Sequence, residues 1–137
     1  MSQVFAATST TIGPYHYSVT PLDAVAGRDA FLRYAAIMGA MATAAAAVEG
    51  DENAKGTAVG VAYLKNFSSA DMKYFCDLFS PLTSVKGLDY KGAPQLNDVF
   101  STHFVKRYAD LMKWISFCFE VNEFQRFFAE MKEEKGA

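Results

Sequence analysis

The first regular pattern along the chain is a period-two alternation in the segment YHYSVT, residues 15–20. Apolar residues at every second position alternate with polar ones, which is typical of a half-buried strand. A strand needs a partner, and the other extended candidate is the region of residues 83–90. We therefore expect, at most, a short two-stranded β ribbon. Residues 1–13 are small and polar and are expected to form a flexible N-terminal arm.

Helical signals dominate the middle of the chain. Thr20 followed by Pro21 indicates an N-cap and a first helical position, so we expect a helix over residues 21–49. Ser68 and Asp71 have the spacing of a capping box and predict a second helix that ends before Pro81.

Two segments between these signals are less regular. Residues 57–66 are interpreted as a short helix, although Val59 and Val61 are also compatible with a strand. Residues 81–95 contain Gly, Pro and Ser and are expected to form a long loop.

The C-terminal third returns to helical spacing after Asn97. One face carries apolar residues at the expected intervals, namely Phe104, Tyr108, Leu111, Ile115 and Cys118. Beyond Leu111 the other faces are apolar as well, which predicts a helix surrounded by protein. Asn122 and Gln125 have the spacing of a capping pair, so we expect a break there and a final helix after it.

These elements predict a mainly α fold, a single small bundle of about five helices to which the ribbon would be added. The expected organisation is an N-terminal arm at residues 1–13, one helical domain at 14–131 and a solvated tail at 132–137. A chain of 137 residues suits one domain.

Charge and composition exclude several classes of protein. The 15 acidic and 13 basic residues leave a net charge of -2, without the basic patch that nucleic-acid binding requires. The N-terminus lacks the pattern of a secretory signal, so we expect a cytoplasmic protein. The apolar run at residues 34–48 carries no charge, but it is largely Ala and shorter than the roughly 20 apolar residues of a membrane span.

Candidate chemistry is sparse. His16 and His103 have no spacing that pairs them with Cys76 or Cys118, which we expect to be reduced core thiols. No metal-ligand motif or phosphate-binding glycine loop occurs. We therefore expect no enzyme activity, no cofactor and no metal.

Aromatic residues are the unusual feature of the chain. They make up 15% of it, and they concentrate in the last forty residues, as in WISFCFEVNEFQRFF at 114–128. Each ring buries about 150–250 Å², which is more than a small core accommodates easily. Part of this surface is expected to contact a protein partner.

The same C-terminal residues resemble a known family, the phage tail assembly chaperones. The similarity spans residues 15–128, and its specific part lies within residues 100–128. It departs from the family's pattern at Val105-Lys106, where a Gly is frequent, and at Glu123, where an aromatic residue or Gly is usual. The matching run comprises Phe100-x-x-x-Phe104, Tyr108-x-x-Leu111-x-x-Trp114, Phe117-x-x-Glu120-Val121-Asn122 and Phe127-Phe128.

The resemblance implies a protein of the host cell cytoplasm that binds the tape measure protein and keeps it soluble until the tail tube assembles. It implies further partners: the tail tube protein, a frameshifted longer form of the same chain, and sister copies. Such a chaperone is not expected in the mature virion. The alternative is an oligomeric structural component of the virion, a ring or completion protein.

The residues expected to form the partner-binding surface come from the aromatic run and its helix break. For Glu120 and Asn122 a structural role, shaping the break and satisfying its backbone groups, is the competing interpretation. The full set is Trp114, Phe117, Glu120, Asn122, Phe124, Phe127 and Phe128.

Overall fold

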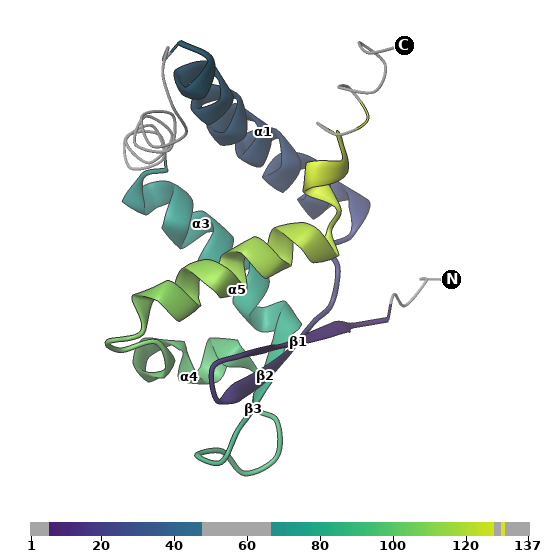
Figure 1. Cartoon of the computed structure of the whole chain (residues 1–137). Helices are drawn as coiled ribbons and strands as arrows, with labels where there is room; N and C mark the ends of the chain where they lie inside the picture. The colour runs from purple at the N-terminus through teal and green to yellow at the C-terminus, as the bar shows by residue number, and fades with distance from the viewer. Residues whose placement is uncertain (1–5, 48–66, 128–129, 131–137) are drawn as a thin grey trace. The chain divides into compact units, whose positions relative to one another are not determined.

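A computed structural model describes residues 6–47, 67–127 and 130 of the chain (Figure 1). The chain divides into two compact units. One, which we call the sheet unit, comprises residues 1–23 and 75–137; the other, the helical unit, comprises residues 24–74. The predicted helix at 57–66 and the predicted tail at 132–137 lie outside the described residues. The expected single domain over 14–131 stays a prediction.

The sheet unit is built on three antiparallel strands in the order β1-β2-β3 (Figure 1). Strand β2, Tyr15–Val19, buries its alternate residues, as its period-two pattern predicted. It pairs with β3, Thr83–Lys86, which lies within the region expected to supply its partner. On its other side β2 pairs with β1, Thr8–Ile12.

Strand β1 corrects two expectations. A mainly α bundle with at most a two-stranded ribbon is wrong, because helices combine with a three-stranded antiparallel sheet in a mixed architecture. The arm expected at residues 1–13 contains β1, while residues 1–5 lie outside the described part. The two-residue turn Gly13-Pro14 closes the β1–β2 hairpin, and Gly13 has a φ of 58°, which suits glycine.

The helices of the sheet unit follow β3. Helix α4, Leu96–His103, and helix α5, Tyr108–Val121, are separate, whereas the sequence predicted one helix through this region. Residues 104–107 form the break, and Lys106 has a φ of 62° there, which no α-helix accommodates. The short 3-10 helix η1, Ser80–Leu82, and strand β3 occupy the start of the expected long loop.

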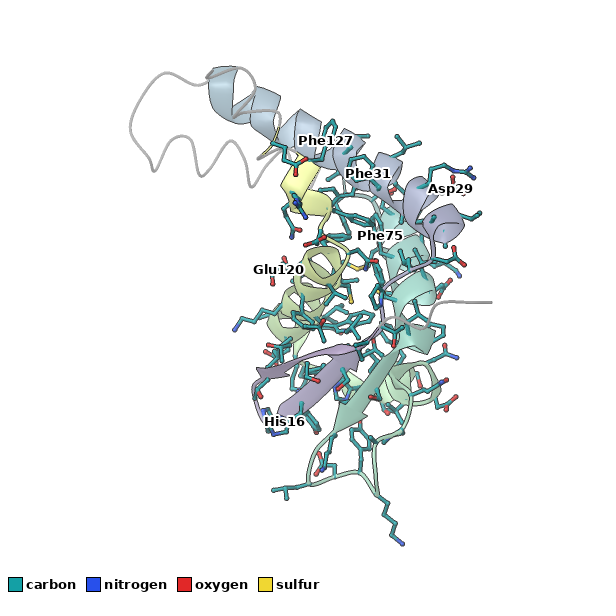
Figure 2. The ribbon with its side chains drawn as sticks, turned by 90° about the vertical axis from the view of Figure 1, so that its right-hand side faces the viewer. His16, Asp29, Phe31, Phe75, Glu120 and Phe127 are labelled. Carbon is teal, nitrogen blue, oxygen red and sulfur yellow. The ribbon has the colours of Figure 1, made fainter. Side chains whose placement is uncertain are left out.

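Aromatic rings form the core of the sheet unit. Phe75, Phe79 and Phe119 contact one another, with the Phe75 and Phe119 centroids 5.0 Å apart; Figure 2 shows Phe75 among other side chains. The Trp114 indole donates a hydrogen bond to Thr83 Oγ1 at 3.2 Å. Cys76 and Cys118 are buried free thiols, as expected, and burial raises the pKa of Cys76 to about 11.

The helical unit contains α1, Ala24–Ala47, and the first residues of α3, Ser69–Phe79. Helix α1 begins three residues after Pro21, so its predicted start is wrong. The capping box of α3 is confirmed: Asp71 N donates to Ser68 Oγ at 3.1 Å, and Ser68 N donates to Asp71 Oδ2 at 3.1 Å. Helix α3 ends before Pro81, as predicted. No helix among the described residues is long and apolar enough to span a membrane.

Candidate partner-binding groove

A groove of about 450 Å³ runs between β1 and α5 in the sheet unit. Strand β1 supplies its floor and α5 supplies one wall. Hereafter we call this the α5 groove. Its lining residues are Thr10, Ile12, Met112, Lys113, Ser116, Phe117 and Glu120.

The helical repeat of α5 separates the groove side chains from the core. Trp114, Ile115 and Cys118 are buried. Lys113, Ser116 and Glu120 are exposed, and their spacing of three and four residues puts them on one outward face. Figure 2 shows Glu120 on the outside of this helix. The wall of the groove is therefore the face of α5 that its own core does not use.

Strand β1 contributes through its pairing with β2. Thr10 lies opposite Tyr17 and Ile12 lies opposite Tyr15, and directly opposed residues project from the same face of a sheet. Both tyrosines are buried, so Thr10 and Ile12 project toward the side on which α5 packs. Ser9 and Thr11 project from the other face, where they bond Ser18 Oγ at 2.7 Å and His16 Nδ1 at 2.8 Å.

The α5 groove combines apolar and charged side chains. Ile12, Met112 and Phe117 supply the apolar surface, and Phe117 is half-buried. Lys113 and Glu120 are seven residues apart, which is about 10 Å along a helix axis. This combination suits an amphipathic peptide segment better than a small polar molecule.

The structure brings together two of the predicted partner-binding residues, Phe117 and Glu120, in this groove. Trp114 is fully buried and Phe124 is 6% exposed, so both are core residues, contrary to their expected place on the surface. Phe127 is 44% exposed, outside the groove. Phe128 lies outside the described residues.

Asn122 satisfies backbone groups at the helix break, which is the structural role given above as the alternative to partner binding. Its Nδ2 donates to the Cys118 carbonyl at 2.8 Å, and its Oδ1 accepts a hydrogen bond from Leu22 N at 2.8 Å. Helix α5 ends at Val121, and helical residues resume at 124–127, which confirms the predicted break. Glu123, between them, has a φ of 56°.

Five residues of the α5 groove were not predicted from the sequence, namely Thr10, Ile12, Met112, Lys113 and Ser116. The two from β1 were missed because the strand was missed. The available signal was the Gly13-Pro14 pair, which lies between the β-branched Ile12 and the alternating segment that follows.

A second polar cluster surrounds His103, which is 4% exposed. Its Nε2 lies 2.6 Å from the Tyr17 hydroxyl, and its Nδ1 lies 2.6 Å from the Tyr90 hydroxyl. Burial, assisted by the nearby Arg107 charge, lowers the pKa of His103 to about 4. Burial also raises the pKa of Tyr17 to about 12. A neutral imidazole with both nitrogens engaged is a structural link between β2, the 87–94 loop and α4.

Comparison with known proteins gives one finding. A family model described as phage tail assembly chaperone protein, TAC, matches residues 13–136. The matched range includes α5, the wall of the groove, and begins one residue after β1, its floor. Comparison with curated proteins and with solved structures gives no match.

Proposed function

Because the chain belongs to the phage tail assembly chaperone family, we propose that it binds the tape measure protein through the α5 groove. By covering apolar helices of this client it keeps the client soluble in the host cytoplasm until the tail tube assembles. The chaperone itself does not enter the mature virion. Its further partners are sister copies, the tail tube protein and a frameshifted longer form of the same chain.

The observation that supports this proposal is the position of Phe117. It is half-buried in an open groove with Met112 and Ile12, beside the charged side chains of Lys113 and Glu120. An amphipathic helix binds such a groove by inserting its apolar face while its polar flanks meet the charged rim. Binding of this kind needs no chemical step for release, because subunits that bury the same apolar face of the client displace the chaperone.

The test is co-expression of the full chain with the tape measure protein, followed by affinity purification and quantification of the soluble client. Phe117→Ser should reduce the copurifying client at least tenfold, since a buried aromatic contact is worth about 1.5–3 kcal/mol. Leu88→Ser is the matched control, because Leu88 is fully exposed on the loop after β3 and is remote in sequence from the groove. It should leave client recovery unchanged.

Folding has to be separated from binding in this experiment. Both variants should keep the circular dichroism spectrum and the urea midpoint of the natural chain, because neither residue belongs to the fully buried core. If Phe117→Ser folds normally and recovers as much client as Leu88→Ser, the α5 groove is not the client site.

A further inference from the structure

We propose that a second copy of this chain pairs with β1 edge to edge and turns the one-sided α5 groove into a two-sided trough. The identity of the client in that trough rests on the proposed function. The pairing itself rests on the sheet and is testable without any client.

The two edges of the sheet differ. At β3, Val85 N donates a hydrogen bond to the Pro94 carbonyl at 3.0 Å, and Ser84 forms a β-bridge with Gln95. That edge is therefore covered by residues of the same chain. Strand β1 is the other edge, and among the described residues no further strand pairs with it. Its outward backbone groups are available to another strand.

Strand β1 also lacks the devices that usually protect an edge. Its sequence, TSTTI, contains no charged residue, no Pro and no Gly, and it is rich in β-branched residues. Two of its exposed side chains, Ser9 and Thr11, are held by hydrogen bonds to β2. The edge is thus regular and uncharged, which favours the addition of a strand.

The register of the hairpin fixes which backbone groups point outward. Ile12 and Tyr15 flank the two-residue turn, so they form a hydrogen-bonded pair, and such pairs alternate along the strands. The N–H and C=O groups of Thr10 therefore face β2, while those of Ser9 and Thr11 face away from it. A second β1 strand can bond these two residues.

Identical strands that pair antiparallel are related by a two-fold axis, which gives a self-complementary interface. With the axis at Thr10, Ser9 of each copy bonds Thr11 of the other, and the two Thr10 residues form the central, non-hydrogen-bonded pair. All outward groups of Ser9 and Thr11 are then satisfied. Shifting the register by one residue would leave Ser9 and Thr11 without these partners.

The same axis completes the groove. Thr10 and Ile12 of both copies form a continuous floor, and α5 of the second copy supplies the missing wall in the opposite direction. Because Asp110, in the first turn of α5, lies beside Gly13 at the end of β1, the Lys113 end of one wall lies on the same side of the axis as the Glu120 end of the other. Opposite charges face each other at both ends, and Phe117 of each copy lies toward the middle. The trough is therefore self-complementary in charge as well as in backbone.

The experiment uses the full chain without client. Light scattering after size exclusion should give the mass of two chains. Thr10→Cys should form an intermolecular disulfide on mild oxidation, because Cα atoms of a non-hydrogen-bonded pair are about 4.5 Å apart, within disulfide reach. Ser9→Cys is the matched control, since the two Ser9 residues are offset along the strands to beyond about 7 Å. The natural thiols are buried and should not interfere.

A second pair of variants tests the backbone directly. Thr11→Pro removes one outward N–H and should convert the dimer to monomer, whereas Thr11→Val should keep it. Both variants lose the hydrogen bond from Thr11 to His16, so its loss cannot explain a difference between them. A monomeric natural chain, or equal cross-linking of Thr10→Cys and Ser9→Cys, overturns the proposal. If the chain is a monomer that still binds the client, the two-sided trough is wrong and the proposed function stands. If it is a dimer that does not bind the client, the proposed function is wrong and the pairing of β1 stands.

Discussion

At the scale of single residues, His103 makes the stability of the protein depend on pH. Burial and the Arg107 charge lower its pKa from 6.5 to about 4 in the folded chain. Between these values the unfolded chain binds a proton that the folded chain does not. The contribution of His103 to the free energy of unfolding should therefore be constant above about pH 6.5 and should decrease as the pH falls toward 4. At pH 5 the decrease should be about 2 kcal/mol.

Urea denaturation of the natural chain and of His103→Gln measures this contribution. Glutamine keeps a donor and an acceptor but does not titrate in this range. The natural chain should lose about 2 kcal/mol more than the variant between about pH 7.5 and about pH 5. Parallel pH profiles for the two proteins would mean that His103 is not held neutral.

The candidate site shows what residue patterns predict and what they do not. Phe117 and Glu120 were predicted and lie in the α5 groove, while Trp114 was predicted beside them and is buried against Thr83. The polar residues Lys113, Ser116 and Glu120 recur at helical spacing and mark the outward face of α5, and Trp114 lies off that stripe, so this signal was present in the sequence. Which of the rings beside the stripe stays accessible, as Phe117 does, depends on packing against other segments and is not local information.

At the scale of elements, the backbone at Lys106 separates α4 from α5. Its φ of 62° is costly for a residue with a side chain. Lys106→Gly should raise the free energy of unfolding by about 0.5–1 kcal/mol, after allowance for the greater freedom of glycine in the unfolded chain. Urea denaturation at neutral pH measures the change.

The neighbouring Val105 provides the control for this variant. It is exposed, like Lys106, but its backbone is outside the left-handed region. Val105→Gly should lower the free energy of unfolding, because glycine there brings only added freedom to the unfolded chain. A loss of stability in both variants would show that the side chain of Lys106, not its backbone, matters.

The elements that the sequence predicted are those with local chemistry. The period-two pattern of β2 and the Ser68–Asp71 capping box are each complete within a few residues. Strand β1 was missed because TSTTI is polar and small, and its pairing depends on β2 rather than on itself. The α4–α5 break was missed because Phe104, Tyr108 and Leu111 keep helical spacing across it. Position 106, where φ is positive, is a lysine and not the glycine that would have indicated a break.

At the scale of the whole molecule, the two candidate roles differ in where the protein is found after assembly. A chaperone that binds through a groove such as the one around Phe117 holds its client by reversible contacts alone. Under the proposed function, tail tube subunits that polymerise around the tape measure would cover the same apolar helices and compete for them. The bound copies should therefore dissociate as the tube grows.

Quantitative mass spectrometry of purified virions and of the lysate from the same infection measures this directly. The protein should be abundant in the lysate and fall below one copy per particle in virions purified through a density gradient. The tail tube protein, measured in the same samples, is the reference for a component that stays. A constant number of several copies per virion would favour the ring or completion protein, because only a subunit fixed in the particle keeps a fixed stoichiometry through purification.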